Sequence, residues 1–360
     1  MTQKAYKIGI IPGDGIGPEV IKSTLALLDG LCPSHGITLD YVVYELGAEV
    51  YRRTGHRITS QEMDEIGELD AVLLGAMGLP DVRMPDGTEC GPQVDLRGYL
   101  GLFASLRPAR LYRGIPTRMQ FGRDQKLDIL VIRETTEGMF AGLNDSFSPN
   151  DSELTDRMTI TRKTCLKLFR TAFNQARHRR QQLGTPGKVT LLHKSNALRS
   201  NTLLVKVFKE IATEFPDIEW SEYYIDAGAM YFVTDPERYD VVVTENIFGD
   251  IVSEVAAGLV GGLGVAPSGD ISERHGIFQP SHGSAPDIAG KNVANPVAMW
   301  LSAVMMLDWL GETRGDDKCL EASKHLQQVI EKQLADGPKT RDIGGNATTT
   351  EVTQCLLSWL

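Results

Sequence analysis

The stretch YKIGIIPGDGIGPEV, residues 6–20, places a strand, a turn and the start of a helix within one short span. Residues 6–11 form a mostly apolar run of strand length, and residues 13–17 carry three glycines. Pro18 suits the first turn of a helix, where its missing amide hydrogen needs no partner. Apolar residues then recur at helical spacing, at Val20, Ile21, Leu25 and Leu28. The order strand, turn, helix predicts an α/β fold.

The same rhythm continues along the chain, because 36 glycines and 17 prolines separate short apolar runs from longer amphipathic ones. Further strands are expected at residues 38–44, 71–74, 127–132, 189–192 and 241–244. Helices are expected at residues 161–182, 198–214, 250–259, 297–310 and 319–334. The polar segment 144–161 is expected to form a surface loop with a short hairpin or, equally well, an arm that pairs with its copy in a second subunit.

The glycine turn resembles a dinucleotide-binding fingerprint only in part. Its spacing is G-x-G-x-G and not G-x-G-x-x-G, and Asp14 places a negative charge where a phosphate group is expected to lie. We therefore do not expect a Rossmann fold from this turn.

Charge and composition limit the partners of this protein. The 360 residues include 37 Lys and Arg against 47 Asp and Glu, which gives a net charge of −10. This balance disfavours nucleic acid and membrane surfaces as partners, since both are anionic. The basic run 177–180 ends a predicted helix, where positive charge complements the helix dipole. The partners are therefore expected to be small molecules.

The sequence also indicates the compartment. No apolar run reaches the roughly 18–20 residues that a membrane span needs, and no signal peptide is visible. The five cysteines are widely spaced without a C-x-x-C pair, which favours reduced thiols over disulfides or a zinc site. We expect a cytoplasmic protein.

Three arginines stand in apolar or turn contexts, at Arg97, Arg107 and Arg133. A single arginine is usually a solvated surface residue. Arg133 follows a predicted strand, however, and open α/β sheets bind ligands at the carboxyl ends of their strands. The guanidinium group matches a carboxylate in a bidentate geometry. Together the three predict a clamp for a small dianion.

Several other polar side chains lie at the ends of predicted strands or at the start of helices. Lys194 and Asp226 each follow a strand, whereas Asp250 and Glu254 project from one face of a helix. A solvated surface position explains the acids equally well and is the more frequent case for the lysine. A divalent cation would relieve the repulsion between the two acids, and nearby cations would lower the pKa of the lysine enough for it to act as a base. The long turn-rich segment 282–296 is a candidate functional loop, although His282 alone is more often structural.

Taken together, these motifs resemble the β-decarboxylating 2-hydroxyacid dehydrogenases, the family of the isopropylmalate, isocitrate, homoisocitrate and tartrate/D-malate dehydrogenases. The resemblance covers nearly the whole chain. It is carried by residues 10–19, 74–76, 106–108, 133–134, 194–196, 226–227, 246–251, 282–296 and 344–345, with Arg97.

The resemblance implies a two-domain α/β fold with a mixed sheet, of the isopropylmalate/isocitrate dehydrogenase type and not Rossmann. Residues 1–104 plus 262–360 would form a large cofactor-binding domain. Residues 105–261 would form a middle domain, with a dimerisation arm around 144–161. The protein would be a homodimer with shared active sites, in which the partner subunit supplies Lys194 and one aspartate, Asp226.

The same resemblance implies a role for each motif residue. Substrate would be bound by Arg97, Arg107, Arg133, Asn196, Gln93 and Val94. Mg²⁺ or Mn²⁺ would be held by Asp226, Asp250 and Glu254. The cofactor would be bound by Ala76, His282, Gly283, Ala285, Asp287, Ile288 and Asn295. Lys194 would take the hydroxyl proton while hydride passes to the nicotinamide, after which the keto acid loses CO₂.

Asp287 and Ile288 indicate which dinucleotide is used. A carboxylate that bonds ribose hydroxyls would repel a 2′-phosphate, and the NADP-using members of the family have Lys-Tyr at this point. The resemblance therefore implies NAD.

Two positions depart from the family pattern. Phe140 stands where members usually have a tyrosine that protonates the enol, and Glu254 is one methylene longer than the usual aspartate. Phe140 leaves open a second hypothesis, a catalytically weakened ligand-binding paralogue of the same fold.

The substrate is expected to be a malate-like 2-hydroxy diacid of the 3-isopropylmalate, D-malate or tartrate type. Isopropylmalate members carry an apolar pair where this chain has Gln93 and Val94, homoisocitrate members tend to have arginine at the Val94 position, and isocitrate members have serine where this chain has Gly91. The run Thr136-Glu137-Gly138 is similar to tartrate and malate members.

Overall fold

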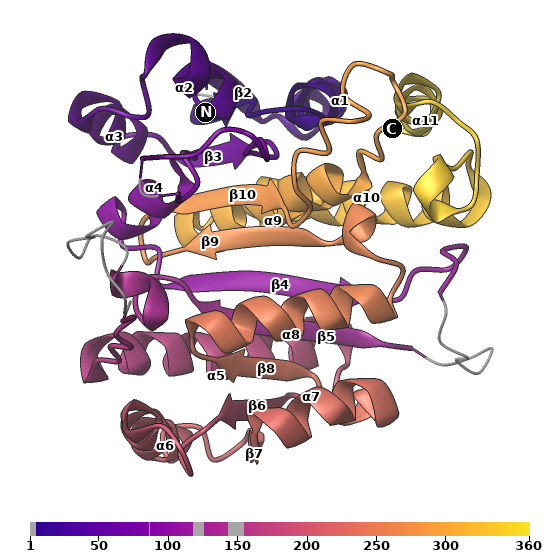
Figure 1. The fold of residues 1–360 in the computed structure, drawn as a ribbon. Coiled ribbons are helices and arrows are strands. Elements are labelled where there is room, and N and C mark those ends of the chain that lie inside the picture. Colours follow the sequence, from indigo (N-terminus) through magenta and orange to yellow (C-terminus); the bar gives the residue numbers. More distant parts are fainter. Residues whose placement is uncertain (1–4, 86, 118–125, 143–154) are drawn as a thin grey trace. The chain divides into compact units, whose positions relative to one another are not determined.

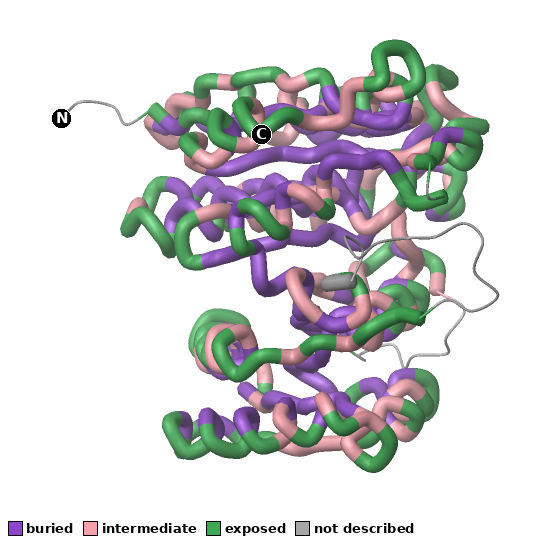
Figure 2. Tube along the Cα trace, turned by 60° about the vertical axis from the view of Figure 1, so that its left-hand side comes forward, coloured by how far each residue is buried: buried purple, intermediate pink, exposed green. Residues whose placement is uncertain are grey.

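The computed structural model describes residues 5–85, 87–117, 126–142 and 155–360. The chain folds into two compact units. Figure 1 labels their helices and strands. Unit 1 comprises Met1–Leu100, Tyr112–Arg118 and Gly261–Leu360, and unit 2 comprises Gly101–Leu111 and Met119–Val260. Most strands of both units are buried, whereas the strands Thr38–Val43 and Glu219–Tyr224 are half-buried or exposed, as are many helical residues (Figure 2).

Unit 1 contains a mixed sheet with the strand order β2-β1-β3-β10-β9. These strands span Thr38–Val43, Ala5–Ile11, Ala71–Leu74, Gly276–Pro280 and Pro267–Ile271. β1 runs parallel to both β2 and β3, and β10 runs parallel to β3 but antiparallel to β9. Because four of the five strands run in one direction, the chain leaves β1 and β3 at the same sheet edge.

Seven α-helices belong to unit 1 in the part of the chain that is described. They are α1 Gly17–Leu31, α2 Ala48–Thr54, α3 Ser60–Gly67, α4 Gln93–Tyr99, α9 Val297–Arg314, α10 Asp317–Asp336 and α11 Thr349–Leu357. Short 3₁₀ turns η1 Cys32–His35, η4 Leu263–Val265 and η5 Arg341–Ile343 connect them. Helix α9 is buried on nearly all sides, which follows from its almost uninterrupted apolar sequence.

Unit 2 contains the strand order β4-β5-β8-β6-β7. These strands span Ala104–Arg110, Asp128–Glu134, Val241–Thr244, Lys188–His193 and Glu219–Tyr224. β4 is antiparallel to β5, and the remaining pairs are parallel. Helices α5 Arg162–Leu183, α6 Arg199–Ala212, α7 Ile225–Thr234 and α8 Asn246–Leu259 belong to this unit, with the 3₁₀ turns η2 Met139–Gly142 and η3 Pro236–Arg238. Within residues 126–134, the chain enters β5 at Asp128, and this strand pairs with β4 on one side and β8 on the other.

All the strands and helices expected from the sequence are present, with two boundaries wrong by four residues. The helix expected at 297–310 continues to Arg314. The helix expected at 250–259 begins earlier, at Asn246, because the Glu245 carboxylate accepts hydrogen bonds from the amides of Ile247 and Phe248 and so caps its first turn. The segment 144–161, expected to form an arm, lies mostly outside the described residues.

The glycine turn after β1 is a structural junction. Asp14 is only 3% exposed, and its carboxylate accepts hydrogen bonds from the amides of Ala48, Glu49 and Gly78 at 2.8–2.9 Å. Gly47 must lack a side chain, because a Cβ there would lie 2.8 Å from the Asp14 carboxylate. Asp14 therefore binds the start of α2 and the segment after β3, which explains a negative charge at a turn that resembles a phosphate loop.

A buried ion pair in unit 2 leads to a prediction about stability. Asp240 accepts hydrogen bonds from Arg179 Nε and the Gly187 amide, each at 2.8 Å, and both charged side chains are buried. We expect Asp240→Ala to lower the free energy of unfolding by about 3–5 kcal/mol, because it leaves the Arg179 charge buried beside one remaining acid. Urea denaturation measures this change.

The exposed pair between Arg170 and Glu214 provides the control, since its N–O distance is also 2.8 Å. Glu214→Gln should leave the unfolding free energy nearly unchanged, because water screens this exposed pair. Equal losses in the two variants would contradict the assignment of Asp240 as a buried structural charge.

No helix in the described part of the chain is long and apolar enough to cross a membrane.

Candidate active site

Two of the predicted substrate arginines converge on one aspartate in unit 2. Arg107 lies on β4 and Arg133 near the end of β5, and these strands are antiparallel neighbours. Arg107 Nη1 donates to Asp250 Oδ1 at 3.2 Å and to Ser253 Oγ at 2.9 Å. Arg133 Nη1 donates to the same Asp250 oxygen. The strand pairing thus brings two guanidinium groups to the first turns of α8.

Hydrogen bonds to Asn246 hold Arg133 in one orientation. Its Nε and Nη2 donate to Asn246 Oδ1 at 3.0 and 2.8 Å, while Asn246 Nδ2 donates to the Glu137 carbonyl at 2.9 Å. Gly249 must lack a side chain, because a Cβ there would lie 2.7 Å from the Arg133 side chain. The guanidinium is therefore oriented before any ligand arrives, which lowers the entropic cost of binding a carboxylate.

The ring of Phe140 lies beside the same arginine. Its centroid is 5.5 Å from Arg133 Cζ, a distance typical of a cation–π contact. The Phe140 side chain is 38% exposed. The residue that replaces the usual tyrosine thus lies next to a predicted substrate arginine and remains accessible.

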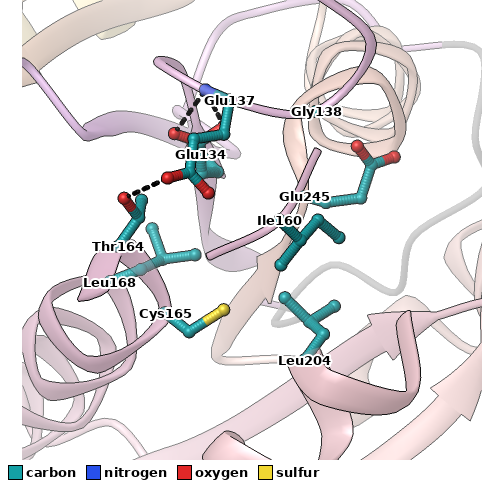
Figure 3. A pocket seen from close by; sticks show the side chains of 9 residues that line it. All are labelled: Glu134, Glu137, Gly138, Ile160, Thr164, Cys165, Leu168, Leu204 and Glu245. Atoms are coloured by element: carbon teal, nitrogen blue, oxygen red, sulfur yellow. Dashed lines mark hydrogen bonds between the residues drawn. The ribbon is translucent and has the colours of Figure 1, made fainter. Parts of the chain in front are cut away.

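A cluster of buried acids supports the turn that precedes Phe140 (Figure 3). Glu134 accepts hydrogen bonds from the Thr136 amide and hydroxyl and from the Glu137 amide. Glu137 in turn accepts from the Thr161 amide and the Thr164 hydroxyl, each at 2.7 Å. Burial raises the pKa of the Glu134 and Glu245 carboxyls. The enclosed volume of about 10 Å³ holds roughly one water molecule, so we assign the cluster a supporting role.

Lys194 and Asp226 form an ion pair at the edge of unit 2. Lys194 follows β6 and Asp226 lies in the first turn of α7, and Lys194 Nζ is 2.6 Å from Asp226 Oδ1. This hydrogen bond lowers the pKa of Asp226. Asn196 lies exposed in the turn after Lys194. All three side chains therefore face solvent at one sheet edge.

The predicted metal ligands do not meet within one chain. Asp226 pairs with Lys194, Asp250 contacts the two arginines, and Glu254 is exposed one turn along α8. Among the described residues, no group of three acidic, histidine or cysteine side chains is placed to hold a metal ion. The donors themselves suit a hard divalent cation, because all are carboxylate oxygens.

The third predicted arginine belongs to unit 1. Arg97 Nε donates to Asp270 Oδ2 at 2.8 Å, and Gln279 Nε2 donates to the same oxygen at 3.2 Å. Gln93 lies one helical turn before Arg97 on α4, so the two share a face. Its Oε1 is buried and has no hydrogen-bond partner among the described residues, whereas Val94 is exposed.

A pocket of about 640 Å³ in unit 1 is large enough for a nucleotide. It is lined by Ile16, Gly264, His282, Ile288, Val293, Asn295, Arg341, Asp342, Asn346 and Ala347. His282 Nε2 is buried there without a partner, and burial lowers the pKa of this histidine, so the ring is neutral near pH 7. A neutral imidazole with an unpaired nitrogen fits a ligand that offers a complementary hydrogen bond, as an adenine ring does.

The other predicted cofactor residues lie around this pocket in different ways. Gly283 and Asp287 are exposed on the loop, and Ala285 has a left-handed φ of 39°. Ala76 is buried, does not line the pocket, and accepts a hydrogen bond from the Asp14 amide at 2.8 Å.

Sequence reasoning missed part of the pocket wall. Arg341, Asp342 and Asn346 line it, and the only signal for them in the sequence was the adjacent pair Gly344-Gly345. Asn295 Nδ2 donates to Asp342 Oδ2 at 2.8 Å, which joins the loop to this distant segment.

Two units of mixed α/β structure, a nucleotide-sized pocket and an oriented pair of guanidinium groups define the class of dehydrogenases that oxidise small acids. The chain belongs to the isocitrate/isopropylmalate dehydrogenase family, whose model matches residues 7–356. It is a β-decarboxylating dehydrogenase, and enzymes of this family use a nucleotide cofactor and a divalent metal to act on small dicarboxylates. The fold class predicted from the sequence is confirmed.

Individual relatives agree with this assignment. The 3-isopropylmalate/3-methylmalate dehydrogenase of Methanocaldococcus jannaschii is 42% identical over 350 residues, which cover 97% of each chain. The crystal structure of isocitrate dehydrogenase from Methylococcus capsulatus matches with a TM-score of 0.83 and 31% identity over 98% of each chain. That of a β-decarboxylating dehydrogenase from Thermococcus kodakarensis matches with a TM-score of 0.75 and 32% identity, over 98% of this chain and 95% of the other.

Proposed function

We propose that the protein catalyses the NAD- and divalent-metal-dependent oxidative decarboxylation of a malate-like 2-hydroxy diacid, of the 3-isopropylmalate, D-malate or tartrate type. The observation that carries this proposal is the convergence of Arg107 and Arg133 on one carboxylate, that of Asp250. Two charge-assisted donors at a strand end are the arrangement that a dicarboxylate substrate needs. We propose Arg97 as a further substrate-binding arginine.

Two observations bear on the group at C3 of the substrate. The relative at 42% identity is named for 3-isopropylmalate and 3-methylmalate, which carry alkyl groups there. Gln93 instead offers a buried and unpaired oxygen beside the Arg97 face, which favours a substituent that can donate a hydrogen bond. The substrate panel below therefore includes substrates with an alkyl group at C3 and substrates with a hydrogen-bond donor there.

The residues of this chain supply binding and proton transfer. Arg107 and Arg133 hold the carboxylates, and Lys194 takes the proton of the substrate hydroxyl. Asp250 and Glu254 of one subunit, with Asp226 of its partner, are the residues that would hold Mg²⁺ or Mn²⁺. When bound, the metal polarises the substrate oxygens and stabilises the enolate left by loss of CO₂, while NAD accepts the hydride.

A homodimer with shared active sites is part of the proposal. Unit 2 exposes large apolar side chains on α7 and α8, at Met230, Val233 and Ile251, and Ile251 is 57% exposed. Helices α7 and α8 contact each other, and exposed apolar side chains on neighbouring helices suit a surface that a second subunit covers. Ile251 follows Asp250 directly, so a second copy on this face would bring its own Lys194 and Asp226 close to the arginine pair. The domain division at residues 104/105 and 261/262 and a cytoplasmic location remain predictions.

The exposed Asp287 and the half-buried Ile288 support NAD over NADP, since Ile288 lines the nucleotide-sized pocket and Asp287 is its neighbour. We expect the double change Asp287→Lys with Ile288→Tyr to shift the ratio of kcat/KM values about 100-fold toward NADP, because it removes a charge that repels the 2′-phosphate and adds one that attracts it. Initial rates with each dinucleotide measure this ratio.

Asp336→Lys is the matched control, because it makes the same charge change at the end of α10. It should leave the dinucleotide ratio unchanged. The same ratio in the double variant and the wild type would refute the role assigned to Asp287.

The decisive test is a substrate panel. Purified protein with Mn²⁺ and NAD is supplied with 3-isopropylmalate, D-malate, tartrate or isocitrate, and NADH formation is followed by absorbance. Turnover on one of the first three supports the proposal, whereas turnover on isocitrate alone would refute the proposed substrate class. Tight binding of a diacid, measured by calorimetry, without turnover on any substrate would favour the weakened ligand-binding paralogue, for which Phe140 is the specific reason.

A further inference from the structure

The loop segment 292–295 is bound to two helices by residues that do not line the nucleotide-sized pocket. Helices α1 and α11 contact each other, and the loop runs beside them (Figure 1). Thr349, the first residue of α11, donates its amide to the Asn292 carbonyl at 3.0 Å. Its hydroxyl is 2.7 Å from the Ala294 carbonyl and also lies beside the Glu19 carboxylate, so these two acceptors share its single proton. The start of α11 thus holds the loop backbone directly through the Thr349 amide.

Glu19 of α1 completes this contact from the other side. Its Oε1 accepts hydrogen bonds from the Ala294 amide at 3.1 Å and from the Thr349 hydroxyl. Thr349 is only 3% exposed. Removal of its hydroxyl would leave a half-buried carboxylate without one of its donors, which is costlier than the loss of an exposed hydrogen bond.

Asn292 adds a side-chain contact and an unusual backbone. Its Oδ1 accepts hydrogen bonds from the Thr350 amide at 3.1 Å and from the Thr350 hydroxyl at 2.9 Å. Its φ is 57°, and among the described residues only Asn292 and Ala285, on the same loop, combine a side chain with a positive φ. Such a conformation persists only where the surroundings enforce it, and asparagine tolerates it better than most residues.

Along this segment, residues that contact the two helices alternate with residues that line the pocket. Asn292 and Ala294 contact α1 and α11, whereas Val293 and Asn295 line the pocket. Asn295 is fixed in turn by Asp342, and a Cβ at Gly264 would lie 2.4 Å from that carboxylate. Contacts with α1, α11 and Asp342 therefore shape this part of the pocket wall.

We propose that Glu19, Asn292 and Thr349 form a latch that presets the loop for the dinucleotide, so that these three are positioning residues for cofactor binding. This inference rests on the proposed function, in which the pocket binds NAD. A latched loop loses less conformational freedom when the cofactor binds, and the latch therefore strengthens cofactor affinity without touching the cofactor. It should act on dinucleotide binding and leave the arginine pair of unit 2 unaffected.

The test compares dinucleotide affinity among latch variants of the full-length protein. Thr349→Val keeps the shape of the side chain but removes the hydroxyl, and Thr349→Ser restores it. We expect Thr349→Val to raise the Kd for NADH, measured by fluorescence titration, roughly tenfold, and Thr349→Ser to stay near the wild-type value. The KM for the diacid should change less than twofold in both.

Two variants at Asn292 separate the effect of its backbone conformation on cofactor affinity from the effect of its hydrogen bonds. Asn292→Gly accepts the positive φ but loses the bonds to Thr350, whereas Asn292→Asp keeps an acceptor. We expect the glycine variant to raise the Kd for NADH severalfold and the aspartate variant to retain most of the affinity. Thr59→Val is the matched control, because the Thr59 hydroxyl also donates to a glutamate carboxylate, that of Glu62 at 2.9 Å, far along the chain from the loop.

The outcomes separate this inference from the function on which it rests. Wild-type protein that binds neither NADH nor NADPH would overturn the proposed function and the latch together. Normal binding by the wild type, with an unchanged Kd in Thr349→Val and Asn292→Gly, would overturn the latch alone. The latch would also be overturned by an equal rise of the Kd for NADH in Thr59→Val, or by equal rises of that Kd and of the diacid KM in Thr349→Val. Either result would show that the substitutions act through the general stability of the protein.

Discussion

Phe140→Tyr is expected to raise the yield of CO₂ per NADH formed and to speed overall turnover about 100-fold. After oxidation and loss of CO₂, the enolate carbon must take a proton, and the phenyl ring of Phe140 has none to give. A tyrosine hydroxyl at this position supplies a general acid. Product analysis by mass spectrometry, together with NADH absorbance, measures decarboxylation relative to oxidation.

The structure accommodates this change without rearrangement. The Phe140 ring is 38% exposed and rests 5.5 Å from Arg133 Cζ, so an added hydroxyl does not need to be buried. Phe140→Leu is the control, because it removes the ring and adds no donor, and it should give no gain. If the CO₂ yield of Phe140→Tyr equals that of the wild type, another group already delivers the proton.

Lys194→Met is expected to lower kcat about 1,000-fold and to change the Kd for the diacid much less. Lys194 Nζ pairs with Asp226 at 2.6 Å, and in the proposed mechanism it removes the proton of the substrate hydroxyl. Methionine retains the length of the side chain and cannot accept a proton. Steady-state rates and calorimetric binding of the diacid separate the two quantities.

Two further variants identify the role of the lysine. Lys194→Arg keeps the positive charge beside Asp226 but stays protonated, so it should remain inactive if proton transfer is the role of Lys194. Lys188→Met is the matched control on the same strand β6, where Lys188 pairs with Glu219 at 3.2 Å, and it should retain full activity. High activity in Lys194→Arg would show that charge alone is required.

Much of the fold followed from the sequence because strands and helices depend on neighbouring residues. The run 6–11 and the helical spacing after Pro18 were sufficient for β1 and α1. β4 was not predicted, because its arginines and proline interrupt the apolar pattern. It nevertheless pairs along its whole length with β5, and this backbone pairing holds the segment as a strand although its apolar pattern is interrupted.

The candidate site could be predicted by residue type but not by contact. Arg107, Arg133 and Asp250 stood out individually, and only the pairing of β4 with β5 and the start of α8 show that they meet. Arg97 stood out in the same way, yet its Nε is bound to Asp270. Asp342 gave almost no signal, because its contact with Asn295 depends on a chain return that no local pattern encodes.

Local patterns were sufficient to predict the alternating α/β elements and the motifs that place the chain in its family, and the acidic net charge follows from composition. Periodicity and turn chemistry act over only a few residues. By contrast, the role of Asp14 as a structural junction and the contact of Glu19 with Thr349, 330 positions further along the chain, are visible only in the folded protein. Such contacts form only when strand register and helix packing close long loops, so no short stretch of sequence can specify them.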